Sequence, residues 1–187
     1  MLLAVATIGL DDRAHALPGE TVGEVATWIQ MHPTLQPAPG ETLLIRRTDS
    51  PSRRFTFEAS IRPPGRAVRG DRRDIIRSEQ ISLFDTVYGV TPDRLEESLD
   101  ILYGAELLAD YQQAEVVYQY PTPELIERAD RENLPLLRLS QGEVRRGDRF
   151  AYWIETVQIP DRRPQSGRVV VFLLEDLPKV LTELEAR

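Results

Sequence analysis

Residues 54–63 read RFTFEASIRP, and residues 152–160 read YWIETVQIP, so two distant stretches of the chain nearly repeat each other. In both stretches an aromatic run carries one glutamate, Glu58 or Glu155, and a proline closes the run five residues later. Runs of aromatic and β-branched residues are typical of β-strands. We therefore predict two related strands about a hundred residues apart in the chain.

The sequence around these two strands repeats as well. An apolar stretch precedes each strand through a turn: LLIRR at 43–47 and LLRLS at 136–140. A short amphipathic segment that opens with Thr21 or Thr122 comes before each pair, and Arg66 and Arg163 fall in register after it. Recurring segments of this length indicate repeated supersecondary units. The sequence thus predicts two helix–hairpin units, at about residues 21–66 and 122–163.

Further helices and strands are expected from capping residues and apolar spacing. Helices are predicted from Thr21 to about Met31, from Thr91 to Gly104, from Thr122 to before Pro135, and around 177–184. Strands are predicted at 1–8, 114–120 and 168–174, and residues 75–87 are expected to be extended or mixed. Irregular alternation of helices with hairpins favours an α+β fold with an antiparallel sheet and flanking helices. We predict a single domain over residues 1–187.

Composition excludes several classes of protein. The 187-residue chain is 41% hydrophobic, which is ordinary for a globular protein, and no apolar run reaches the length of a membrane span. It has no cysteine, so disulfides and thiolate chemistry are absent. A formal charge of −7 argues against broad nucleic-acid binding, which needs a basic surface. We expect a cytoplasmic protein.

Four segments together resemble the effector-binding domain of GntR-type regulators (the UTRA domain), which has the chorismate-lyase-like fold. They are the double-apolar strand at 43–47, the Glu-to-Pro strand at 58–63, the SLFDTVYGV segment at 82–90, and the Glu-rich stretch at 96–99. The resemblance covers roughly residues 21–175. It implies an antiparallel sheet whose strand arginines grip an acidic ligand. No winged-helix region precedes the segment, so a transcription-factor role is not expected.

Strand alternation gives the two glutamates different surroundings. Glu58 shares its face with Thr56, Ser60 and Arg62, so we expect it on a polar face. Glu155 shares its face with apolar residues, Trp153 among them, so we expect it to be buried and held by an arginine or by backbone donors. The nearest candidate arginines are Arg138 and Arg168. The alternative is a bulge or edge position that exposes Glu155.

Two candidate sites follow. A planar guanidinium can hold a carboxylate or phosphate through two hydrogen bonds, so we predict a ligand site made of Arg46, Arg47, Glu58, Ser60, Arg62 and Glu155. An Arg-rich, Gly- and Pro-containing loop could dock an acidic partner, and its candidate residues are Arg66, Arg69, Arg72 and Arg73. Solvated side chains and internal salt bridges remain the alternative explanation for both sets.

Searches for catalytic motifs find none. His15 and His32 lack metal-ligand spacing, and there is no nucleophile elbow, phosphate loop or dinucleotide fingerprint. We therefore expect no metal, no cofactor and no catalytic residue. The leading hypothesis is a non-catalytic protein that senses or carries a small anion. The alternatives are an adaptor or assembly factor that binds a protein, and a chorismate-lyase-like enzyme; a homodimer is also left open.

Overall fold

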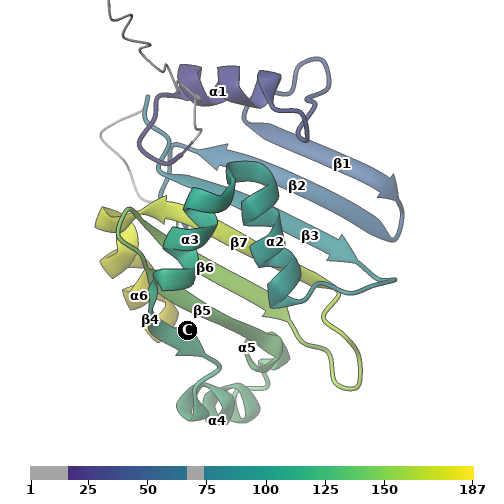
Figure 1. Ribbon diagram of the computed structural model, residues 1–187. Helices are drawn as coiled ribbons and strands as arrows, with labels where there is room; N and C mark the ends of the chain where they lie inside the picture. Colours follow the sequence, from purple (N-terminus) through teal and green to yellow (C-terminus); the bar gives the residue numbers. More distant parts are fainter. Residues whose placement is uncertain (1–16, 67–73) are drawn as a thin grey trace, which may run out of the picture.

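A computed structural model describes residues 17–66 and 74–187, which form an α+β fold around one seven-stranded antiparallel sheet (Figure 1). The strand order across the sheet is β1-β2-β3-β7-β6-β5-β4. The strands are β1 (Leu44–Ser50), β2 (Arg53–Ser60), β3 (Ser78–Asp85), β4 (Glu115–Tyr120), β5 (Ser140–Arg146), β6 (Phe150–Val157) and β7 (Ser166–Leu173).

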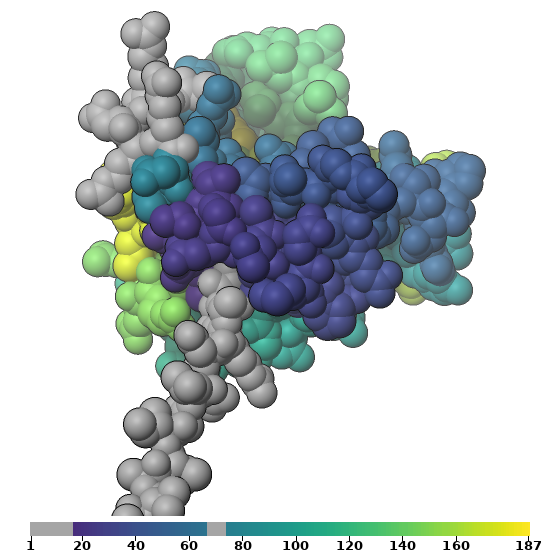
Figure 2. Space-filling view, turned by 90° about the horizontal axis from the view of Figure 1, so that it is seen from above, coloured from purple at the N-terminus to yellow at the C-terminus, as the bar shows by residue number. Residues whose placement is uncertain are grey.

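Six α-helices flank this sheet within the described residues. They are α1 (Val22–Met31), α2 (Pro92–Tyr103), α3 (Ala105–Gln113), α4 (Pro123–Arg131), α5 (Pro135–Leu139) and α6 (Leu177–Glu185), the last preceded by a 3₁₀ turn, η1 (Leu174–Asp176). Helices α2 and α3 cross one face of the sheet, which we call the front face, and α6 lies behind it (Figure 1). Seen from above, α1 and the segment after it cover the β1 end of the molecule (Figure 2).

The helix starts follow directly from the sequence. Thr21 makes a reciprocal capping box with Glu24, and the hydroxyls of Thr91 and Thr122 accept hydrogen bonds from backbone amides in the first turn. Gly104 ends α2 with a φ of +80°, a region that glycine adopts without strain. The predicted helices are therefore confirmed, but α3 begins at once after Gly104 and was not expected from the pattern.

The front face carries an apolar row across five strands. Its members pair in register from β1 to β6: Ile45, Phe57, Ile81, Val169 and Ile154. All five are buried, and they pack in one cluster with side chains of α1, α2 and α3 such as Trp28, Leu99 and Tyr111. This cluster is the main core.

The opposite, back face is covered over part of its width. Helix α6 packs Val180 and Leu184 against Trp153, Val170 and other back-face side chains in a second core. Toward β2 and β3 the back face becomes polar and no helix of the described residues covers it. The functional candidate lies on this open part.

The two Glu-bearing hairpins, β1–β2 and β5–β6, occupy related places in the sheet. Glu58 pairs with Leu44 and Gln80, and Glu155 pairs with Gly142 and Arg168. Ile81 of β3 pairs with Val169 of β7 midway between the two hairpins. A twofold axis through this pair, perpendicular to the sheet, would map the strand pairs of Glu58 onto those of Glu155. The preceding helices do not obey it: α1 packs into the front core, whereas Leu125 of α4 packs into the back core. The predicted repeat of a whole helix–hairpin unit is therefore not reproduced.

One local expectation is wrong. Residues 136–140 are not a strand, since Pro135–Leu139 form α5 and β5 begins at Ser140. A proline at the first helical position favours a helical turn, which outweighs the apolar run that follows it. Consequently the residue that pairs with Glu155, as Leu44 pairs with Glu58, is Gly142 and not a residue of 136–140.

Some predictions fall outside the described residues. These are the strand at 1–8, His15, and the loop arginines Arg69, Arg72 and Arg73. Among the described residues, no helix is long and apolar enough to cross a membrane.

Candidate functional site

An open depression of about 410 Å³ lies on the back face where β2, β3, β7 and β6 run side by side. We call it the polar hollow. Residues that pair in register on neighbouring strands point to the same face of the sheet, so the pairing shows which side chains form the floor of the hollow. Seven of its eleven lining residues have polar side chains, although apolar atoms make up most of the exposed lining. The lining consists of Arg54, Thr56, Gln80, Ser82, Leu83, Phe84, Glu155, Val157, Ser166, Gly167 and Arg168.

One polar row crosses this floor. From β1 to β6 the paired residues are Arg46, Thr56, Ser82, Arg168 and Glu155. This row is displaced by one residue on each strand from the apolar row of the front face, so alternation alone separates the core from the hollow. Gln80 donates from Nε2 to Ser82 Oγ at 3.0 Å, which orients two of the hydrogen-bonding groups beside the row.

Arg54 forms one rim of the hollow. Its guanidinium carbon lies 4.2 Å from the centre of the Phe84 ring, directly across the β2–β3 ladder. This stacking holds the guanidinium by its plane and leaves its N–H edges available. Among the described residues Arg54 makes no ion pair, so its charge is not neutralised locally.

Glu155 forms the other side and is bound from three directions. Arg168 Nη2 lies 2.9 Å from Oε1, while Arg187 Nη1 and the Tyr120 hydroxyl donate to Oε2 at 2.9 and 2.6 Å. Trp153 donates to the Tyr120 oxygen at 2.8 Å and packs beneath Arg168, whose guanidinium carbon is 4.3 Å from the ring centre. The carboxylate is thus fixed and its charge is offset by two arginines.

Electrostatics follow from these contacts. Burial by itself raises the pKa of Glu155, but the charge of Arg168 and the hydrogen bonds from Tyr120 and Arg187 outweigh it, so the pKa lies below its ordinary value. Burial also raises the pKa of Tyr120, and the adjacent Glu155 raises it further, so its hydroxyl stays a donor. Arg168 keeps a buried Nε without a hydrogen-bond partner in the described structure. The lining holds two arginines, Arg54 and Arg168, against one glutamate, Glu155, so its balance of formal charges is positive.

The prediction for Glu155 is confirmed. Its side chain is only 14% exposed, and Arg168 binds it. Its strand neighbours alternate without a bulge, so the exposed alternative is wrong. Arg138 was the second suggested partner, and this is wrong, because it pairs with Asp130 at 2.9 Å beside α4.

The other predicted ligand residues do not line the hollow. Arg46 and Glu58 lie on its face but farther out, both exposed. Ser60 accepts a hydrogen bond from the Arg62 backbone N–H at 3.1 Å, which closes the end of β2. Arg47 points to the front face, where it binds Glu41 and the Leu35 carbonyl.

The Arg-rich loop is described only at its start. The Arg66 backbone N–H donates to Glu183 of α6 at 2.8 Å, and Lys179 donates to the Pro64 carbonyl at 2.7 Å. These contacts tie the beginning of the loop to the C-terminal helix.

Of the predicted ligand residues only Glu155 lines the hollow, and the polar lining residues missing from that prediction are Arg54, Thr56, Gln80, Ser82, Ser166 and Arg168. Alternation along β2 places Arg54 on the face of Glu58, and the SLFD segment contains Ser82 and Phe84, so each strand held a usable signal. The pairing of β3 with β7 was the information that the sequence did not supply.

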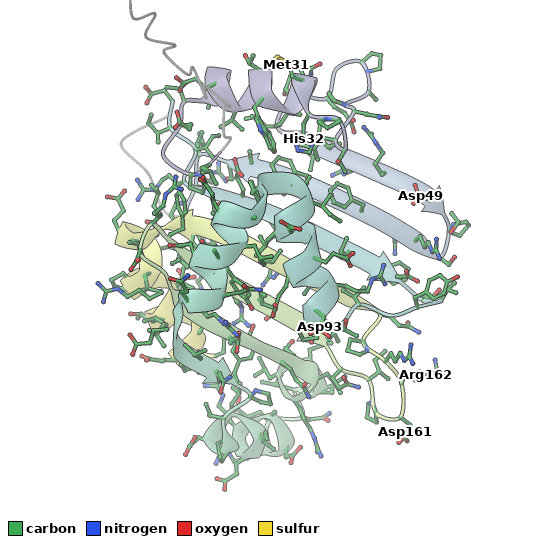
Figure 3. All side chains as sticks on the ribbon, viewed as in Figure 1. Met31, His32, Asp49, Asp93, Asp161 and Arg162 are labelled. Carbon is green, nitrogen blue, oxygen red and sulfur yellow. The ribbon has the colours of Figure 1, made fainter. Side chains whose placement is uncertain are left out.

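His32 has a structural position. Its ring Nε2 lies 3.1 Å from the Leu102 carbonyl oxygen, its ring packs on Trp28, and burial lowers its pKa (Figure 3). Within the described residues no group of histidine and carboxylate side chains could hold a metal ion. Comparisons with protein-family models, curated proteins and solved structures found no match.

Proposed function

We propose that the polar hollow binds a small anionic molecule and that the protein acts as a non-catalytic sensor or carrier, as the resemblance to UTRA domains implies. One observation carries this proposal. On a chain with a net charge of −7, the hollow gathers Arg54 and Arg168 beside hydroxyl and amide groups, while its glutamate is already paired.

The chemistry suits a carboxylate or a phosphate. Arg54 offers free N–H edges above a stacked ring, and Thr56 and Ser82 offer hydroxyls between the two arginines along adjacent strands. Planar guanidinium groups bind such anions through paired, charge-assisted hydrogen bonds. The volume of about 410 Å³ is within the range of small-molecule sites.

A titration followed by ¹H–¹⁵N NMR tests the proposal, with sodium butyrate and sodium phosphate as probes. We expect saturable shifts of the amides of Thr56, Ser82 and Arg168. Arg54→Gln should weaken binding about threefold to tenfold, because Arg54 is exposed and its charge is partly screened. Arg131→Gln on α4 removes the same charge far from the hollow and should leave the affinity unchanged. Absence of shifts with both anions, or equal affinities of the two variants, would rule the site out.

A protein partner is the second candidate. Val87 and Tyr88, in the turn after β3, are 61% and 58% exposed, and Arg53 stacks on the Tyr88 ring at 4.6 Å. Exposed apolar side chains next to an uncovered sheet face are typical of interaction surfaces. A protein without affinity for either anion, combined with a partner whose binding is abolished by Tyr88→Ser, would favour this candidate.

A further inference from the structure

A second depression, of about 430 Å³, lies on the front face at the β4 edge of the sheet. We call it the edge cleft. It forms because α2 and α3 leave most of the front face of β5 and β4 uncovered (Figure 1). Beyond β6 the apolar front row continues as Glu143 on β5 and Gln119 on β4, so the floor becomes polar.

One carboxylate in this cleft, that of Glu96, keeps an uncompensated negative charge in the described structure, because the other charged groups pair with each other. Gln119 Nε2 donates to Glu143 at 3.0 Å, Arg145 forms an ion pair with the same carboxylate, and Arg145 stacks on the Tyr111 ring at 4.5 Å. Glu143 and Arg145 therefore neutralise each other. Glu96, on α2 above the floor, has no cationic partner among the described residues, and only its Oε1 is engaged, by the Tyr111 hydroxyl at 3.2 Å.

Unused acceptors lie beside that charge. Thr156 is 5% exposed, lines the cleft, and its hydroxyl makes no hydrogen bond within the described part of the chain. Gln141 pairs with Thr156 in the ladder, so the two side chains are direct neighbours on the floor. The Thr156 hydroxyl therefore has unused hydrogen-bonding capacity at the cleft surface, which a ligand with N–H donors can engage.

We propose that the edge cleft binds a small organic cation that carries a primary ammonium group on an apolar stem. An ammonium group has three donors and no acceptor. Glu96, Thr156 and the Gln141 side-chain carbonyl can serve these donors, while Pro92 and Ile154 provide apolar contact for the stem. This site is opposite in charge to the polar hollow and lies on the opposite face of the sheet, so it does not depend on the function proposed above.

Three probes with the same stem test this inference by ¹H–¹⁵N NMR: n-butylamine, 1-butanol and sodium butyrate. We expect butylamine to shift the amides of Glu96, Gln141 and Thr156 saturably. Butanol should bind there at least about threefold more weakly, since it lacks the charge, and butyrate should not bind there at all. Butyrate shifts at the polar hollow report on the other proposal separately.

Matched variants test which residues of the edge cleft bind butylamine. Glu96→Gln should weaken butylamine binding about threefold to tenfold. Glu97→Gln removes the same charge from the neighbouring exposed residue of α2, outside the cleft, and should change nothing. Thr156→Val, which keeps the shape and removes the hydroxyl, should weaken binding at least twofold (about the value of one neutral hydrogen bond). Equal affinities for butylamine and butanol, or equal effects of Glu96→Gln and Glu97→Gln, would overturn the assignment.

Discussion

Two rows of side chains cross the sheet one residue apart, and they differ in almost every property. The front row, from Ile45 to Ile154, is apolar and buried under helices. The back row, from Arg46 to Glu155, is polar and borders an open hollow. Adjacent residues therefore differ in their surroundings: Phe57 is buried in the main core, and Thr56 lines the hollow. The front row therefore holds the fold together, whereas the back row stays open to solvent and to ligands.

Adjacent alanine substitutions should show the largest contrast. Phe57→Ala removes a fully buried ring that contacts Trp28, so the free energy of unfolding should fall by about 3–5 kcal/mol. Thr56→Ala changes the back row and should cost less than about 1 kcal/mol. Urea denaturation of both variants measures the difference, and similar losses would refute the division between the rows.

Glu79 is the exception on the front face and should make stability depend on pH. It is fully buried beside the Tyr103 hydroxyl, 2.7 Å away, and burial raises its pKa from 4.5 to about 7. Because the folded state holds this proton more tightly, the free energy of unfolding should fall as pH rises from about 4.5 to 7, by about 3 kcal/mol in total. Above about pH 7 both states are ionised and this contribution becomes constant.

Glu79→Gln isolates this effect, because the amide stays neutral and still accepts from Tyr103. Relative to the parent, the variant should gain about 3 kcal/mol between pH 5 and pH 8. Urea midpoints at the two pH values provide the measurement. A pH profile shared by parent and variant would show that Glu79 does not titrate in this range.

Glu155 is the corresponding exception on the back face, since it is buried within the polar row. Glu155→Ala leaves Arg168 and Arg187 without their carboxylate, but both arginines are about one third exposed, so we expect a loss of about 2 kcal/mol. Glu155→Gln should cost less, because the amide oxygen still accepts from Tyr120. Thermal melts that show both variants as stable as the parent would contradict a structural role for this cluster.

The smallest effect is expected at Ser82, in the middle of the back row. Ser82→Ala removes the acceptor for Gln80 in a half-buried position, and stability should change by no more than about 0.5 kcal/mol. Butyrate binding should nonetheless weaken measurably if the hollow is the anion site. A large loss of stability at Ser82 would make the back row part of the structural framework.

Local sequence signals predicted the elements better than their assembly. Threonine caps, Gly104 and strand alternation act over a few residues, so α1, α2, α4 and the burial of Glu155 were accessible. The helical turn after Pro135 was missed because its apolar run also fits a strand. The hollow depends on β3 meeting β7, a contact between distant segments that no periodicity encodes, so Arg54 and Arg168 were not placed in one site.

The pairing of β3 with β7 also determines when the sheet can close during synthesis of the chain. β3 ends at Asp85 and β7 begins at Ser166, so one edge of β3 stays unpaired until the long stretch between them has been made. At roughly 5–20 residues per second, translation from the end of β3 to the start of β7 takes on the order of several seconds. Pairing across so long a stretch of chain also slows folding, because the entropy of closing the intervening loop must be overcome first. The newly made β1–β2–β3 segment therefore has an exposed strand edge, and only β7, the last of the seven strands to be made, covers it.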